Sequence, residues 1–194
     1  MPASPALQWG NVPVPYTALW THERDNLRPQ LRMERWNGQK LTMLCSGIEA
    51  PQGKPCFSML HQERTRRVVR EQLCQMCVRP MPADLVGFNQ GQRLEGFPLL
   101  RDGLPMCPSC ALEAFRACPG MARQADAGHL SIWRCYRGHW RTAPTIIRPV
   151  PVARGGVAAV NELLLATRQP VFSGPDLQLL QFTRITLDDL EALA

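Results

Sequence analysis

Two pairs of cysteines have the residue type and spacing of metal ligands. The first pair lies in Cys74-Gln75-Met76-Cys77 and the second in Cys107-Pro108-Ser109-Cys110. A CxxC turn brings two sulfurs to one ion with little backbone strain, and structural zinc takes four thiolate or imidazole ligands in a tetrahedron. Two such turns supply the complete set. The sequence therefore predicts one structural zinc ion, with Cys74, Cys77, Cys107 and Cys110 as its ligands.

The sequence around each pair indicates how the chain positions these sulfurs. Residues 57–73 contain strong helix formers in their second half, which predicts a helix that leads directly into the first pair. Residues 108–117 carry apolar side chains at helical spacing, and Pro119-Gly120 is expected to end this second helix. Cys110 then falls in the first turn of a helix, where the positive end of the helix dipole favours a thiolate.

Two redox-active or merely buried CxxC turns are the alternative to a metal site. Redox pairs of the thioredoxin type open a βαβ unit, and neither pair here has that context. Residues 1–15 lack the pattern of a secretory signal, and no run of 18 apolar residues predicts a membrane span. We therefore expect a cytoplasmic protein, in which thiols stay reduced and eight cysteines favour metal over disulfides.

The run RRVVREQLCQMCVRPMP, followed by LPMCPSCALEAF, resembles the zinc-bound treble clef of HNH-type nuclease relatives, especially short proteins of actinobacteria and their phages. The resemblance covers roughly residues 57–120. It implies a first cysteine turn, then strands or loops over residues 78–106, then a helix whose first turn carries the second pair. The expected fold class is α+β, with a small treble-clef core, a β-hairpin, short strands and several short helices.

The catalytic part of that family's motif is missing from this chain. Active HNH nucleases carry an Asp-His between the cysteine pairs, whose histidine is the general base, and an asparagine later in the segment. Residues 78–106 contain no histidine, no second histidine follows Cys110 closely enough to hold Mg²⁺, and Asn89 cannot replace an imidazole. We therefore expect the fold and the zinc without the nuclease activity, and a diverged metal-dependent nuclease is the least favoured reading.

The remaining cysteines and histidines offer two further hypotheses. A second zinc could use Cys45 and Cys56 with Cys118 or His61, but ten residues separate the first two and no second CxxC turn exists. Cysteines without a nearby partner in the sequence, among them Cys135, are usually small buried apolar residues. A hidden catalytic centre has no support from spacing. Its candidate members are His61, His129, His139, Asp102 and Asp126.

Two arginine-rich stretches could contact an acidic partner. In the first, four arginines recur at spacings of three and four and share stripes of a helix. The second, from Ala127 to Asn161, has no acidic residue and interleaves arginines with aromatics. Such surfaces hold phosphates and stack bases, although a half-buried strand with a solvated basic face explains the same residues. The predicted contacts are Arg64, Arg66, Arg67, Arg70, Trp133, Arg134, Tyr136, Arg137, Trp140 and Arg141.

Composition and turn signals predict one folded unit with extensions. The chain has 194 residues, 45% of them hydrophobic and 20% charged, which is typical of a globular domain. We expect an irregular N-terminal arm over residues 1–30, a zinc-centred α+β core over 31–150, and a helical and strand extension over 151–194. Further expected elements are a hairpin around Asn37-Gly38, strands within 130–150, a helix over 157–168, and a last helix capped by Thr186.

Together these patterns predict a non-catalytic, zinc-stabilised protein of a phage or a bacterium that binds nucleic acid or regulates another process. DNA and RNA are the expected partners, since the net charge is +6 and arginine supplies nearly all of the cations. The alternative is a protein-interaction module, an adaptor or an inhibitor of an acidic protein, because arginine, tryptophan and tyrosine are also enriched at interface hot spots. The sequence leaves the oligomeric state open.

Overall fold

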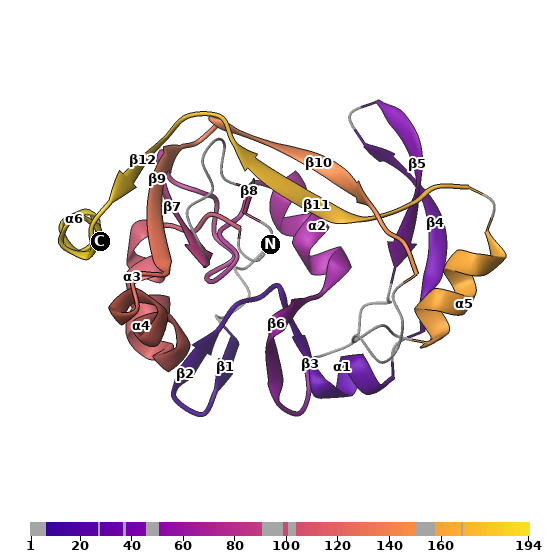
Figure 1. Cartoon of the computed structure of the whole chain (residues 1–194), viewed down its shortest axis with the longest axis horizontal. Coiled ribbons are helices and arrows are strands. Elements are labelled where there is room, and N and C mark those ends of the chain that lie inside the picture. The colour runs from indigo at the N-terminus through magenta and orange to yellow at the C-terminus, as the bar shows by residue number, and fades with distance from the viewer. Residues whose placement is uncertain are drawn as a thin grey trace.

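The structure, a computed structural model, describes residues 7–26, 28–36, 38–45, 51–90, 99–100, 104–149, 158–167 and 169–194. Helices and antiparallel strands are mixed along this chain, so the α+β class predicted from the sequence is confirmed. Two sheets contain most of the strand residues among the described residues, and the paired strands β10 and β11 cross the top of the view between its two sides (Figure 1).

The larger sheet has five strands in the order β10-β11-β5-β4, with β8 paired to β11. Its strands are β4 (Gln30–Trp36), β5 (Gln39–Cys45), β8 (Leu99–Leu100), β10 (Trp140–Ile146) and β11 (Val171–Leu179). The predicted hairpin is present as β4 and β5, with Trp36 opposite Gln39. Gly38 has φ +82, in the left-handed region that a tight hairpin turn requires, while Asn37 lies outside the described residues.

The second sheet has three antiparallel strands in the order β12-β9-β7. These strands are β7 (Asp84–Gln90), β9 (Leu130–Tyr136) and β12 (Phe182–Ile185). Because side chains alternate along a strand, the sheet buries residues on both faces. Val86 and Ile132 belong to one hydrophobic cluster, which also contains cysteines of the predicted metal site, and Leu85 and Cys135 belong to another.

The N-terminal region is regular structure over most of its described part, so the expectation of an irregular arm over residues 1–30 was wrong. β1 (Leu7–Trp9) and β2 (Val12–Val14) form a hairpin, and β3 (Ala18–Trp20) pairs with β6 (Pro55–Leu60). The short helix α1 (Thr21–Asp25) follows β3. Burial of Val14 and Trp20 explains why this region is regular, since both side chains pack into a small hydrophobic cluster with Ala18.

The helices agree with the sequence in most places and differ in two. They are α2 (Gln62–Arg70), α3 (Pro108–Ala117), α4 (Pro119–Asp126), α5 (Ala158–Ala166) and α6 (Leu187–Leu193). The expected helix over 57–73 is shorter than predicted, because its first residues pair with β3 as strand β6. α3 ends at Ala117, just before Pro119, as predicted, but Pro119 also opens α4, a helix that the sequence did not predict, at a first-turn position where proline's missing N–H costs nothing.

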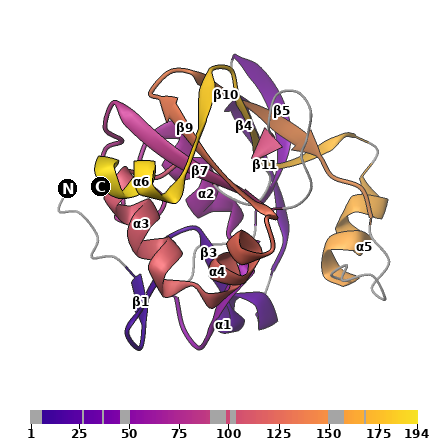
Figure 2. The same cartoon turned by 60° about the vertical axis from the view of Figure 1, so that its left-hand side comes forward.

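Figure 2 shows α3, α4 and α6 together on one side of the three-stranded sheet, while α5 stands away at the opposite end of the protein. α2 lies between the two sheets, where Val68 and Val69 pack against Trp36 and Leu85 in the first hydrophobic cluster. Among the helices of the described residues, none combines the length and the apolar character that crossing a membrane requires.

Candidate metal centre

Four cysteine sulfurs converge at the position that the sequence predicted. The Sγ atoms of Cys74, Cys77, Cys107 and Cys110 all lie within 4.8 Å of one another. Cys107 Sγ lies 3.6 Å from Cys74 Sγ and 3.9 Å from Cys77 Sγ. A tetrahedral zinc site with bonds of about 2.3 Å has sulfur–sulfur edges of about 3.8 Å. The cysteines are free of disulfides, and their arrangement can hold one metal ion with the dimensions of zinc.

The first pair is held by a tight turn that directly follows α2. The bridge between Leu73 and Pro80 closes this turn. Inside it, the N–H of Cys74 donates to the carbonyl of Arg79 at 2.8 Å, and the N–H of Val78 donates to the carbonyl of Cys74 at 2.9 Å. Val78 has φ +57, a conformation that a β-branched residue rarely adopts. The chain therefore reverses immediately after the second sulfur, at the expense of local strain.

The second pair opens α3, as the sequence predicted. Cys107 is the N-cap residue, with extended backbone angles of φ −64 and ψ 149, and Pro108 occupies the first helical turn. The N–H of Ala111 donates to the carbonyl of Cys107 at 3.0 Å, so Cys110 lies within the first turn. The helix N-terminus consequently directs its partial positive charge toward the sulfur cluster, which favours thiolates over thiols.

The short sulfur–sulfur distances make the ionisation of these thiols interdependent. Hydrogen bonds with Cys110 and then with Cys74 lower the pKa of Cys107, whereas hydrogen bonds with Cys107 and then with Cys74 raise the pKa of Cys110. The hydrogen bond with Cys107 is also the main cause of the raised pKa of Cys74. The thiols thus share protons around one favoured thiolate. A divalent cation would replace the shared protons and let all four sulfurs ionise.

A strand pair and a hydrophobic cluster connect the two cysteine segments. Val86 in β7 and Met106, just before the second pair, exchange two backbone hydrogen bonds of 2.8 Å. Met76, from within the first pair, packs with Met106 and with Leu190 of α6 in the same cluster. The order along the chain is therefore cysteine turn, paired strand, and helix start, with the sulfurs on one side of a buried apolar layer.

Two arginines that the sequence assigned to a binding surface are buried, so their assignment was wrong. Arg64 is 4% exposed, and its Nη2 donates to the carboxylate of Glu23 and to the carbonyl of Ala18, both at 2.6 Å. Arg66 is 2% exposed, and it donates to the carbonyl of Leu44 and to Cys45 Sγ. Both guanidinium groups are held inside the protein and cannot meet a partner.

Two of the predicted aromatic contacts are also turned toward the core. Trp133 and Trp140 pack against the first hydrophobic cluster, and the ring of Trp133 meets Phe182 edge-on at 4.8 Å. Tyr136, by contrast, is 47% exposed, and Arg134 lies over its ring at 5.2 Å while pairing with Asp84. The alternation of β9 thus separates Trp133 from Arg134 and Tyr136, as expected for an ordinary half-buried strand.

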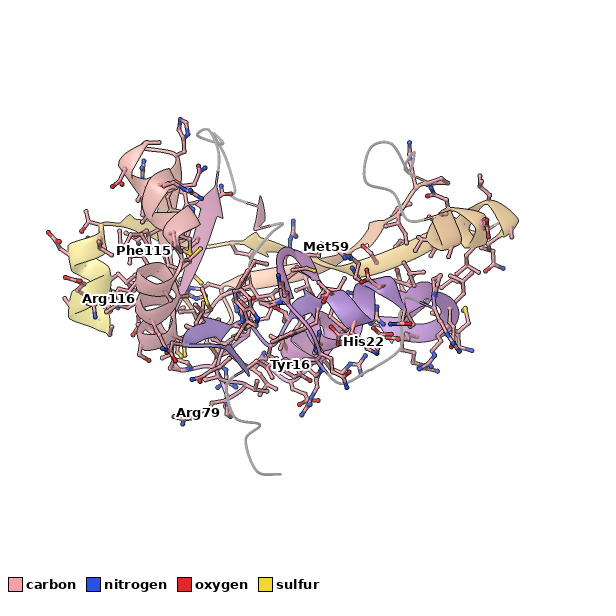
Figure 3. All side chains as sticks on the ribbon, turned by 90° about the horizontal axis from the view of Figure 1, so that it is seen from below. Tyr16, His22, Met59, Arg79, Phe115 and Arg116 are labelled. Atoms are coloured by element: carbon pink, nitrogen blue, oxygen red, sulfur yellow. The ribbon has the colours of Figure 1, made fainter. Side chains whose placement is uncertain are left out.

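Four of the arginines predicted to contact a partner are exposed at the surface. Arg67 and Arg70 are exposed on the last turn of α2, and they form exposed ion pairs with Glu71 and Glu34. Arg137, in the turn between β9 and β10, donates to the Gln72 side chain at 3.0 Å, and Arg141 is exposed on β10. Arg79, in the first cysteine turn, also points into solvent (Figure 3).

The four predicted ligands form the one cysteine and histidine group of metal-binding geometry within the described residues. Cys45 instead lies beside Arg66 and Glu34, and burial raises the pKa of its thiol. His61 is the N-cap of α2, and its Nδ1 accepts from the N–H of Arg64 at 3.3 Å. The second zinc considered for Cys45, Cys56, Cys118 and His61 is therefore not assembled in this part of the chain.

Comparison with known proteins identified no relative of this chain. No protein family, curated protein or solved structure matched the chain. The resemblance of residues 57–120 to HNH-type zinc proteins therefore stays a prediction, and function follows from the geometry of the site and of the surface around it.

Proposed function

We propose that the protein is a zinc-stabilised, non-catalytic nucleic-acid-binding protein whose cysteine site is a treble clef. The cysteine turn, the strand pair through Val86 and Met106, and the helix that begins at Cys107 follow the order of that motif. Four thiolates at tetrahedral spacing suit zinc, which needs no further ligand in a structural site. Zinc then acts as a cross-link between the two cysteine segments and takes no part in chemistry.

The observation that carries the nucleic-acid part of the proposal is the hydrogen bond between Gln72 and Arg137. This contact joins the end of α2 to the turn after β9. Arg67 and Arg70 precede Gln72 by five and two residues, and Arg141 is exposed four residues after Arg137 on β10. Arg67 and Arg70 pair with surface carboxylates, those of Glu71 and Glu34, and such weak surface pairs can be exchanged for contacts with backbone phosphates.

Fluorescence anisotropy with labelled single- and double-stranded DNA and RNA tests this proposal. The zinc-loaded protein should bind with a log affinity that falls linearly with log salt, because each neutralised phosphate releases counterions. The double variant Arg137→Glu/Arg141→Glu should bind more weakly, with a salt slope smaller by about two for two lost phosphate contacts. Its cysteine site should be intact, since neither side chain touches the sulfurs.

The matched control is Arg32→Glu/Arg35→Glu, which makes the same charge change at two exposed positions of β4. This control should lower the affinity only through net charge and leave the slope close to that of the unchanged protein. Equal losses in the two double variants would contradict a specific arginine surface. Absence of binding to all four nucleic acids would overturn the proposal in favour of an acidic protein partner.

A further inference from the structure

A hollow of about 500 Å³ lies beside the cysteine site and has no role in the function proposed above. It is bounded by the β1–β2 hairpin, by β6, by the end of β7, and by residues of α3 and α4. Packed protein interiors contain few voids larger than a water molecule. Binding pockets for small molecules, in contrast, measure about 300–1,000 Å³. The size of this cavity is therefore that of a ligand site rather than of a packing defect.

The wall of the cavity is apolar and uncharged. Leu60, Phe88 and Met121 are typical of it, and no charged side chain is among its described lining residues. Two residues with side-chain amides, Gln75 and Asn89, are among the lining residues. Because a buried charge without a partner is strongly unfavourable, such a wall selects against ionised ligands.

One of these amides is already engaged inside the protein. The hydroxyl of Thr17 donates to Gln75 Oε1 at 3.0 Å, and Gln75 Nε2 donates to the carbonyl of Leu104 at 2.6 Å. Asn89, at the end of β7, is left as the side-chain amide that can meet a ligand. A pocket with a large apolar wall and one such polar group fixes the orientation of its ligand through a single hydrogen bond.

Two aromatic residues of the cavity lining are also exposed to solvent. Trp9 of β1 is 44% exposed and Phe57 of β6 is 51% exposed, although both contribute to the lining. They come from two strands, β1 and β6, that are distant in sequence, so this part of the wall is formed by the fold and not by one loop. Flat apolar surfaces in the wall of a pocket favour a planar or aromatic molecule, because stacking adds to the area removed from water.

We propose that this cavity binds an uncharged, largely apolar small molecule with an aromatic or similarly flat body, and that Asn89 makes its hydrogen bond. Occupancy would also stabilise the metal centre. Met76 lies within the first cysteine pair and Met106 immediately precedes the second, and both side chains line the cavity. A bound molecule therefore packs against both cysteine segments at once, independently of any nucleic acid on the arginine surface.

The test uses the neutral fluorescent probe N-phenyl-1-naphthylamine and its sulfonated counterpart, 8-anilino-1-naphthalenesulfonate, with the zinc-loaded protein. The two probes share the anilinonaphthalene body and differ by one negative charge. We expect saturable one-to-one binding of the neutral probe, at least tenfold tighter than that of the sulfonate, and a higher melting temperature in its presence. Equal affinity for the two probes, or no saturable binding, would overturn the proposal.

Filling the cavity gives the matched variants. Ala117→Phe places a ring into the wall from the last turn of α3, and it should reduce the affinity for the neutral probe at least tenfold. Ala159→Phe makes the same substitution at an exposed position of α5, away from the cavity, and should leave the affinity unchanged. Asn89→Leu should reduce the affinity for the neutral probe several-fold. It should leave the affinity for 1-phenylnaphthalene, which lacks the N–H group, unaltered.

A measurement on the unchanged protein keeps the proposal testable if Ala117→Phe does not fold. Cys118 lines the cavity and is partly exposed, whereas Cys56 has similar exposure and is not part of the wall. The neutral probe should slow alkylation of Cys118 by iodoacetamide and leave that of Cys56 unchanged, as read by peptide mass spectrometry. Unprotected Cys118 at saturating probe would overturn the assignment of the site, and so would a probe-dependent dimer that accounts for the protection.

Discussion

Two regions of the protein connect distant parts of the chain by opposite kinds of chemistry. In the cysteine cluster (Cys74, Cys77, Cys107 and Cys110), like groups converge and need a cation to hold them together. In the buried charge cluster, formed by Glu23, His61, Glu63, Arg64 and Arg66, groups of unlike charge already pair with one another. The cysteine cluster therefore requires a metal cation from outside the chain. The buried charge cluster requires only that every member stays in place.

The buried charge cluster is incompletely satisfied, which limits what it adds to stability. Glu23 Oε2 accepts from Arg64 at 2.6 Å and from the N–H of Trp20 at 2.8 Å. Glu23 Oε1 and Arg64 Nε, however, are buried without a hydrogen-bond partner. The desolvation of such ions can cancel their attraction, so the cluster specifies how β3, α1 and α2 fit together more than it stabilises them. In a metal–thiolate site with four sulfur ligands, by contrast, every thiolate is bound to the cation.

The largest expected effect is loss of the metal. Structural zinc contributes an apparent binding free energy of about 10–16 kcal/mol in small zinc domains, which exceeds the stability of most single domains. Chelation, or the substitution Cys77→Ser, should therefore unfold at least the region of β7, α3 and α6. Thermal denaturation followed by far-ultraviolet circular dichroism, with and without excess chelator, measures this loss.

The matched control for that substitution is Cys118→Ser, because Cys118 lies eight residues after Cys110, the nearest predicted ligand, and outside the cysteine cluster. Its melting temperature should change little, and it should bind one zinc per chain by elemental analysis. An unchanged melting transition of the original protein after complete metal removal would contradict a structural metal. The cysteine cluster, like the buried charge cluster, would then need nothing from outside the chain.

The second expected effect is removal of one partner from the buried charge cluster. Arg64→Met keeps an apolar chain of similar length but leaves the carboxylate of Glu23 buried without its cation, which should cost about 3–5 kcal/mol. Urea denaturation at pH 7 measures the free energy of unfolding. The double variant Glu23→Gln/Arg64→Met should recover part of the loss, since no uncompensated charge remains. Additive losses would show that the two side chains are not coupled.

The same contrast explains what the sequence could and could not predict. Each cysteine pair is local, three residues apart, and its residue type has few other uses, so spacing alone was sufficient. The charge cluster depends on a pairing between Glu23 and Arg64, which are 41 residues apart. Nothing near Arg64 or Arg66 in the sequence distinguishes them from the exposed Arg67 and Arg70. Helical spacing gave a stripe of arginines, and only the packing of β3 and β5 against α2 decides which of them are inside.

Local signals were also sufficient for several elements of the fold. Gly38 marked the turn of the hairpin, the apolar spacing of residues 108–117 marked α3, and Thr186 marked the start of α6. The strands β3 and β6 were missed because three to six residues carry little periodicity, and their pairing is set by tertiary contacts. The ligand-sized cavity was beyond prediction for the same reason, since its lining comes from strands and helices across most of the chain.

The smallest expected effect concerns α6, which extends the region around the cysteine cluster to the last residues of the chain. Leu190 is fully buried in the hydrophobic cluster of the metal centre, and Arg116 of α3 pairs with Glu191 at 2.8 Å (Figure 3). Thr186 Oγ1 accepts from the N–H of Asp189 at 3.1 Å as the N-cap. Thr186→Ala should cost about 1 kcal/mol, and urea denaturation detects whether α6 unfolds with the metal centre or before it.

The N-cap of α6 also makes stability depend on pH, through the carboxylate of Asp189. The backbone N–H of Thr186, followed by its hydroxyl, donates to the Asp189 carboxylate and lowers its pKa below the usual 3.8. A lowered pKa in the folded state stabilises the protein above pH 3.8, and this stabilisation disappears as the pH falls through the lowered value. In Thr186→Ala the backbone donor remains, so the Asp189 pKa measured by NMR should rise only part of the way. A full return to 3.8 would mean that the hydroxyl positions the whole first turn of α6.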